Sequence, residues 1–172
     1  FNRMTSRGYK FYQSLTLASE RNLSFDSMRS TLLKFQEVSP WTTFGHTACN
    51  GAIMEAFQGK SKLHIIDFSN TYCTQWPTLL ELLATRSYET TRLRLTCVVG
   101  GSAATLQKVM REIGYRMEKF ARLMGVPFKF NVIYHNRDLS QLNSAMLDVQ
   151  QDEALVINCI GSLHSVQSDR RD

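Results

Sequence analysis

KLHIIDFSNTYCTQWPTLLELL, residues 62–83, has the pattern of a strand, a turn and a helix. The apolar run at 63–68 is nearly continuous, which is typical of a strand that is buried on both faces of a parallel sheet. Pro77 lies early in the following helix, where proline is tolerated. Nucleotide-binding units of this type carry glycines in the turn, but residues 68–73 contain none. The stretch therefore predicts an α/β unit without the usual phosphate-binding loop.

Three further strands are expected at 92–99, 128–134 and 154–160, with a helix at 106–124. The apolar residues of this helix recur every three or four positions, at Leu106, Val109, Met110, Ile113, Met117, Phe120 and Met124. Alternating strands and helices predict an α/β fold with a parallel sheet and helices on both faces. Because doubly wound sheets usually have more than four strands, the sheet is expected to be incomplete in this chain.

The first 59 residues are expected to be helical. Ser24 or Asp26 can cap one helix, and Ser39-Pro40 can open a second one that ends at Gly59. Small residues in the second helix predict close packing against a neighbouring backbone; they are Gly45, Ala48, Gly51, Ala52 and Ala56. The predicted organisation is a helical cap at 1–59 and an α/β core at 60–172.

The composition fits one globular domain or part of one, with 172 residues and 43% hydrophobic content. The start at Phe1, without an initiator methionine, suggests a fragment of a longer protein. No apolar run reaches the ~20 residues that span a bilayer, so no membrane contact is expected. The net charge of +5 is too small to demand a nucleic-acid partner.

Four cysteines, at 49, 73, 97 and 159, form no C-x-x-C pair. Reduced, buried thiols are therefore expected rather than a disulfide framework. His46 and Cys49 could share a helix face, but no second pair completes a tetrahedral zinc site. We expect no metal site.

An enzyme of the methyltransferase type would use an acid at the end of each of its first two strands. Asp67 provides the first, whereas the second predicted strand runs into Gly100-Gly101 without a carboxylate. The segment Gly100-Gly101-Ser102 is a weak anion-binding signal and more often a turn. Gly161-Ser162-Leu163-His164 lacks the second glycine of a nucleophile elbow. We expect no catalytic residue and no cofactor; the alternative is a small-molecule or S-adenosylmethionine binder that uses Asp67.

Other residues have a structural and a functional interpretation. Asp67 can cap the turn that follows it, and His46 and His64 are more often core histidines than catalytic ones. Leu79, Leu82 and Leu83 match an LxxLL docking pattern, although a crossover helix would bury them. A basic face on helix 106–124 could contact phosphates or an acidic partner, or simply be solvated; it comprises Lys108, Arg111, Lys119 and Arg122.

Long stretches at 33–56, 63–87 and 110–133 together resemble the GRAS family of plant transcriptional regulators, and within it the SHORT-ROOT-like branch. The family's VHIID hallmark corresponds to Leu63-His64-Ile65-Ile66-Asp67. Further family-motif residues are Pro40, His46, Asn50, Gln75 and Pro77. Leu63 replaces the hallmark valine, and Cys49 stands where the family usually has alanine. The resemblance implies a partial GRAS domain, from the end of the first leucine-rich region to the start of the PFYRE region.

The resemblance also implies a Rossmann-like, methyltransferase-related core under a helical cap, without enzymatic activity, a cofactor or a metal. The resemblance further implies a nuclear co-regulator of plant development, with the cytoplasm as a second location. The implied partners are a SCARECROW-like GRAS protein, paired through the cap, and zinc-finger transcription factors. Contact with DNA would then be indirect.

Overall fold

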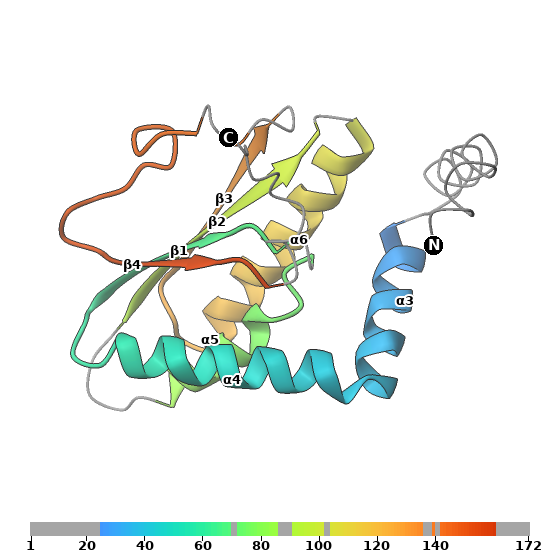
Figure 1. The fold of residues 1–172 in the computed structure, drawn as a ribbon, viewed down its shortest axis with the longest axis horizontal. Coiled ribbons are helices and arrows are strands. Elements are labelled where there is room, and N and C mark those ends of the chain that lie inside the picture. The colour runs from blue at the N-terminus through green and yellow to red at the C-terminus, as the bar shows by residue number, and fades with distance from the viewer. Residues whose placement is uncertain are drawn as a thin grey trace, which may run out of the picture. The chain divides into compact units, whose positions relative to one another are not determined.

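The computed structural model describes residues 25–69, 72–85, 91–101, 104–135, 139 and 142–160. Contacts divide the chain into two compact units, residues 1–40 and 41–172. The helices and strands follow one another as in Figure 1: α3 (Phe25–Val38), α4 (Pro40–Ala56), β1 (Lys62–Asp67), α5 (Trp76–Ala84), β2 (Arg92–Gly100), α6 (Ala104–Leu123), β3 (Phe128–His135) and β4 (Ala154–Asn158). Every predicted strand is present, with limits that differ by at most two residues. Ser24, a predicted cap of the first helix, lies outside the described residues.

The four strands form one parallel sheet in the order β3-β2-β1-β4. The chain moves from β1 to β2 to β3 in one direction and then returns to pair β4 with the other side of β1. This order confirms the predicted α/β fold and creates a topological switch point between β1 and β4. Open α/β sheets bind ligands at the carboxyl ends of the strands beside such a point.

One face of the sheet is covered by helices. Right-handed crossovers that progress in a single direction put α5 and α6 on the same face. Figure 1 shows α4, α5 and α6 on this side, which we call the helix-covered face. Its interior consists of buried apolar side chains from the strands and helices, among them Leu63, Ile65, Leu79, Leu80, Leu93, Leu95, Met110 and Ile113.

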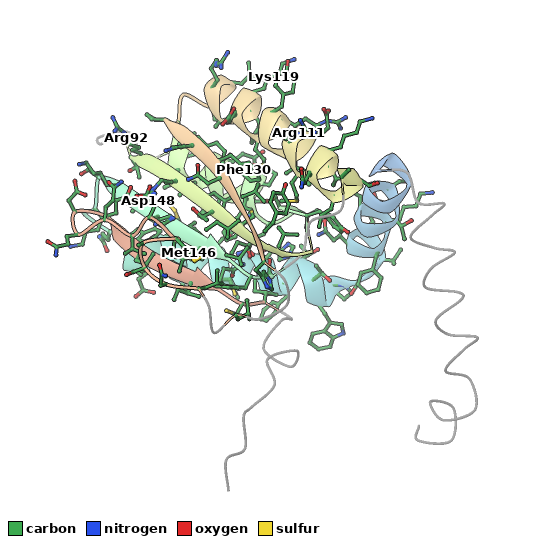
Figure 2. All side chains as sticks on the ribbon, turned by 90° about the horizontal axis from the view of Figure 1, so that it is seen from above. Arg92, Arg111, Lys119, Phe130, Met146 and Asp148 are labelled. Atoms are coloured by element: carbon green, nitrogen blue, oxygen red, sulfur yellow. The ribbon has the colours of Figure 1, made fainter. Side chains whose placement is uncertain are left out.

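The opposite face carries an irregular segment, residues 142–153, instead of a helix (Figures 1 and 2), and we call it the loop-covered face. Two apolar side chains of β4 remain open there, since Leu155 is 42% exposed and Ile157 is 61% exposed. The expectation of helices on both faces is therefore wrong for the described part of the chain. The physical reason is that residues 142–153, the longer described part of the connection between β3 and β4, form turns and irregular backbone rather than a crossover helix.

Helix α4 begins at Pro40 as predicted but ends at Ala56, with a turn up to Gly59. The expected close packing of its small residues is wrong. Among the described residues, a Cβ atom added at Gly45 or Gly51 would meet nothing within 4 Å, and Ala48, Ala52 and Ala56 are exposed. The side of α4 that faces the core carries His46, Asn50 and Ile53 instead. Across the described residues, no helix combines the length and apolar character needed to cross a membrane.

Candidate functional site

The carboxylate of Asp67 is the centre of a buried polar cluster at the ends of β1 and β4. Its Oδ1 accepts hydrogen bonds from the backbone N–H of Ser69 and from Asn158 Nδ2, both at 2.9 Å. Its Oδ2 accepts one from the indole Nε1 of Trp76 at 2.8 Å. Asn158 is the register partner of Asp67 on the neighbouring strand, so both side chains lie on the helix-covered face. Asp67 thereby fixes the turn after β1 and links it to β4.

Gln75 and Asn50 extend this cluster to α4. Gln75 Nε2 donates to Asn50 Oδ1 at 3.0 Å, and Asn50 Nδ2 donates back to the Gln75 carbonyl at 3.3 Å. Asn158 Nδ2 also donates to Gln75 Oε1 at 3.2 Å. Gln75 and Asn50 are fully buried, so these reciprocal amide bonds satisfy groups that would be costly to bury unpaired. Helix, turn and strand are joined through side-chain amides.

The remaining motif residues have structural positions. Pro40 is the first residue of α4, Pro77 is the second residue of α5, and Ile65 and Ile66 are buried in β1. His46 is buried, and its Nε2 has no hydrogen-bond partner within the described part of the chain. Burial lowers the pKa of His46, an effect that the nearby charge of Asp67 partly opposes. His46 is therefore neutral near pH 7.

Two thiols lie beside the Asp67 carboxylate, although their positions in the sequence are 24 residues apart. Cys73 Sγ and Cys97 Sγ are 3.3 Å from each other, and both side chains are buried. This hydrogen bond, together with burial and the charge of Asp67, raises the pKa of Cys97 well above its usual value. A cavity of about 10 Å³ borders this group; its lining comprises Asp67, Tyr72, Cys73, Cys97, Val98, Val99 and Met110. Such a volume holds about one water molecule.

The Gly100-Gly101 segment, which the sequence marks as a weak anion-binding signal and more often a turn, makes a backbone hydrogen bond within the fold. Gly101 has a positive φ of 95°, and its N–H donates to the His135 carbonyl at 2.8 Å. The amide is therefore not available for a phosphate. Ser102 and the Gly161–His164 segment lie outside the described residues.

A second polar cluster lies on the loop-covered face. Arg94 is buried in β2, and its guanidinium donates from Nε to Glu153 Oε1 at 3.1 Å and from Nη2 to Glu153 Oε2, which is a bidentate pair. Arg94 also forms an ion pair with Asp148 and donates to the Asp148 carbonyl. These bonds hold the 142–153 segment against the sheet (Figure 2 marks Asp148).

His64 completes this second cluster and is fully buried. Its Nδ1 accepts from Arg94 Nη2 at 3.2 Å, which requires the neutral ring, and Nε2 then donates to Thr96 Oγ1 at 2.8 Å. Burial and the Arg94 charge lower the pKa of His64. The 3.8 Å approach of Glu153 Oε2 to Nδ1 is therefore not an ion pair.

Leu79 and Leu83 of the LxxLL pattern are buried in the core, whereas Leu82 is 38% exposed. The structure thus leaves one leucine of the three on the surface. The four predicted basic residues of α6, at 108, 111, 119 and 122, are all exposed and lie on the side opposite its buried positions. Figure 2 shows Arg111 and Lys119 pointing away from the sheet.

Sequence reasoning missed several residues of both clusters. Asn158 was identifiable, because it ends a predicted strand beside the strand that carries Asp67. Trp76 precedes a proline at a helix start, which gives no hint that its indole reaches back to a carboxylate. Arg94 stands inside an apolar strand, and a charge at such a position signals a buried partner. Nothing in the sequence pointed to Glu153 as that partner.

Comparison with known proteins identifies the family of this chain. The GRAS domain family model matches residues 1–172. The chain belongs to the GRAS domain family. It is 57% identical to Protein SHORT-ROOT of Arabidopsis thaliana over 98% of this chain and 33% of that protein. It is also 50% identical to Protein SHORT-ROOT 1 of Oryza sativa subsp. japonica, over 100% of this chain and 32% of that protein.

More distant GRAS relatives include DELLA protein GAI1 of Vitis vinifera, at 34% identity over 82% of this chain and 24% of that protein. The crystal structure of SCL7 in Oryza sativa has a TM-score of 0.66 and 30% identity, with coverage of 79% of this chain and 38% of that chain. The likeness agrees with a Rossmann-like α/β fold. The chain spans about a third of the length of the SHORT-ROOT proteins that it matches.

Proposed function

We propose that this GRAS chain is part of a nuclear transcriptional co-regulator of plant development that acts through protein–protein contacts. The cytoplasm is its second location. It pairs with a SCARECROW-like GRAS protein and is recruited to promoters by zinc-finger factors, so its contact with DNA is indirect. The similarity to SHORT-ROOT and DELLA proteins supports a regulatory role.

The observation that carries this proposal is the presence of exposed aromatic side chains on the outward side of α4. Trp41 is 81% exposed and Phe44 is 69% exposed. At ~100° per residue, both lie on the same side of the helix as Ala48 and Ala52, opposite the buried Asn50. We call these four residues, 41, 44, 48 and 52, the α4 stripe.

The α4 stripe has the chemistry of a contact surface. Exposed tryptophan and phenylalanine provide large apolar anchors, which dominate the binding energy of many interfaces. The two alanines allow another backbone to approach closely. Since the helical cap, residues 1–59, is where we expect pairing, we assign the GRAS partner to this stripe.

The carboxyl edge of the sheet supports a non-enzymatic role. Asp67 accepts three hydrogen bonds from its own chain, and the adjoining cavity measures about 10 Å³. Sites for drug-sized ligands and cofactors usually measure roughly 300–1,000 Å³. We therefore expect no change in thermal unfolding when S-adenosylmethionine is added. A saturable rise in the melting temperature would instead favour the alternative, a small-molecule or S-adenosylmethionine binder.

The pairing proposal is tested with the double variant Trp41→Ala/Phe44→Ala and a SCARECROW-like partner. Light scattering gives the mass of the complex, and calorimetric titration gives its affinity. We expect the unsubstituted chain to form a one-to-one complex. The affinity of the double variant for the partner should be lower by about 30-fold or more, because two central aromatic anchors are removed. Thr47→Ala is the matched control, since Thr47 is exposed on α4 outside the stripe. Equal affinity of the double variant and the control would refute pairing through α4.

The exposed basic residues of α6 provide the test of indirect DNA contact. Direct binding to phosphates would weaken steeply with salt. The slope of the logarithm of the binding constant against the logarithm of the salt concentration increases with the number of phosphate contacts. We expect the chain alone to show no such salt-dependent binding to promoter DNA. If it does bind, and Arg111→Glu/Lys119→Glu reduces the salt slope, this face contacts DNA directly.

A further inference from the structure

Three potential metal-ligand atoms converge on the helix-covered face at the carboxyl edge of the sheet. A carboxylate oxygen of Asp67 and the sulfur atoms of Cys73 and Cys97 all lie within 4.8 Å of one another, and all three residues are buried. Asp67 and Cys97 are register partners on β1 and β2. Their side chains are therefore held side by side by the sheet itself.

The third ligand atom is delivered by an unusual turn. Tyr72 and Cys73 have positive φ values of 49° and 62°, a conformation that residues other than glycine adopt at an energetic cost. The turn continues into α5 through the hydrogen bond from Trp76 N–H to the Cys73 carbonyl at 3.3 Å. Backbone of this kind concentrates at functional sites. Its effect here is to direct the Cys73 thiol onto Cys97.

The carboxylate retains a position for a ligand. A carboxylate oxygen has about two acceptor positions. Within the described part of the chain, Oδ1 uses two, for Ser69 and Asn158, whereas Oδ2 uses one, for Trp76. These bonds also hold the group still, as the hydrogen-bonded partners of a metal ligand do. The cavity of about 10 Å³ that borders all three residues has room for one small ion or water.

Although the sequence alone predicts no metal site, we propose that Asp67, Cys73 and Cys97 form a binding site for one thiophilic divalent cation, Zn²⁺ in the cell, with a water molecule as the fourth ligand. Two sulfurs and one carboxylate oxygen suit Zn²⁺ and disfavour Mg²⁺ and Ca²⁺, which prefer oxygen. Tetrahedral bonds of about 2.3 Å place two sulfurs about 3.8 Å apart. Their present separation of 3.3 Å thus needs to open only slightly.

Binding exchanges protons for the metal. The S–H bonds of both cysteines break, two thiolate–metal bonds form, and two protons leave to solvent for each Zn²⁺ bound. No oxidant takes part. Because protons are released, metal affinity should rise with pH.

Other titratable groups lie near the site, so their charges between pH 7 and 8 must be known when proton release is measured. Those near Asp67 and Cys97 come from three elements: Tyr72 of the turn, His46 of α4 and Tyr134 of β3. Helix α6 contributes Met110 to the cavity, which does not titrate, and Arg111 near Tyr134. Burial lowers the pKa of His46 and raises the pKa values of both tyrosines. None of these three side chains therefore changes charge between pH 7 and 8.

The test uses the 172-residue chain, kept reduced with a phosphine and titrated with Cd²⁺ as a spectroscopic stand-in for Zn²⁺. We expect thiolate-to-cadmium absorption that saturates at one ion per chain, reversal by Zn²⁺, and release of two protons. Cys73→Ser and Cys97→Ser should each abolish the band. Cys49→Ser/Cys159→Ser is the matched control, because it removes the two half-buried cysteines outside the site, and it should keep the band.

Several results would overturn the site. They are absence of the band in the unsubstituted chain, persistence in Cys97→Ser, or loss in the Cys49→Ser/Cys159→Ser control. Circular dichroism of the metal-free variants separates lost ligands from lost folding. If Cys97→Ser does not fold, the proton count on the unsubstituted chain decides, and a value near zero rejects thiolate binding. If the mass of the purified chain is lower than expected by two hydrogen atoms and Cys73 is joined to Cys97, the two residues form a disulfide instead.

Discussion

The two faces of the sheet are held by different chemistry. On the helix-covered face, a single carboxylate and a set of amides and thiols lie among apolar side chains. On the loop-covered face, Arg94 and Glu153 join the 142–153 segment to β2 by ion pairs. Apolar side chains of β4 stay open on this second face but not on the first. Helices supply enough apolar contact to need few charges, whereas an irregular segment is fixed by directional bonds.

The largest effect is expected on the helix-covered face, for Asp67→Ala. The substitution removes the acceptor for the Trp76 indole and the Ser69 N–H. Because each buried donor that loses its acceptor costs about 1–3 kcal/mol, we expect a loss of about 3 kcal/mol in the free energy of unfolding. Urea unfolding followed by circular dichroism measures it. Asp67→Asn, which keeps the side-chain shape and one acceptor oxygen, should lose less; equal losses would mean that neither the shape nor a single acceptor is enough and that both carboxylate oxygens are needed.

The fold was largely predictable, and the two polar clusters were only partly so. Continuous apolar strands and a strongly amphipathic α6 mark a parallel sheet through local periodicity, which depends on near neighbours in the sequence. Asp67 was predicted to cap its turn for the same reason, since Ser69 is two residues away. The pairs Cys73–Cys97 and Arg94–Glu153 join residues 24 and 59 positions apart. Such pairs depend on strand order and register, which the periodicity of one sequence does not determine.

A smaller loss is expected on the loop-covered face, for Glu153→Ala. The substitution leaves Arg94 buried with Asp148 as its remaining anionic partner, and Asp148 is itself largely exposed. We expect about 2 kcal/mol less stability, below the roughly 3–5 kcal/mol of a fully broken buried pair. Protease cleavage within 142–153 should become faster. Asp152→Ala is the control, because its pair with Lys62 is exposed, and it should leave unfolding unchanged. Unchanged cleavage in Glu153→Ala would mean that the segment is held by something other than this pair.

The packing of the helix-covered face is tested by Gly114→Ala in α6. An added Cβ would lie 2.5 Å from Cδ1 and 3.4 Å from Cγ of Phe130, so the ring on β3 would have to move. We expect a net loss of about 1 kcal/mol, because the strain exceeds the gain in helix propensity. Gly51→Ala in α4 is the matched control: no atom of the residues that the structure describes lies within 4 Å of its new methyl group, and stability should rise by about 0.5–1 kcal/mol. If both variants gain stability, α6 is not tightly packed on β3.

The smallest effect is a dependence of stability on pH, to which the loop-covered face contributes through His64. His64 has a lowered pKa because it is buried and accepts a hydrogen bond from Arg94, and Glu153 and Asp148 only partly oppose this shift. The unfolded chain takes up a proton near the ordinary histidine value of about 6.5, whereas the folded chain does not. The contribution of His64 is thus complete above pH 6.5 and is lost as the pH falls from there towards its folded pKa.

His46 has a lowered pKa too, so the unsubstituted chain should lose stability from both histidines below pH 6.5. Chemical unfolding between pH 5 and 8 separates them. His64→Gln should be less stable throughout, since it loses the contacts to Arg94 and Thr96, but its profile should be flatter. His46→Gln should also flatten the profile, but without accelerating cleavage within 142–153. If His64→Gln retains the full acid sensitivity, then the neutral His64 that accepts from Arg94 does not cause the pH dependence of stability on this face. The ion pairs of Arg94 would then hold the 142–153 segment without help from His64.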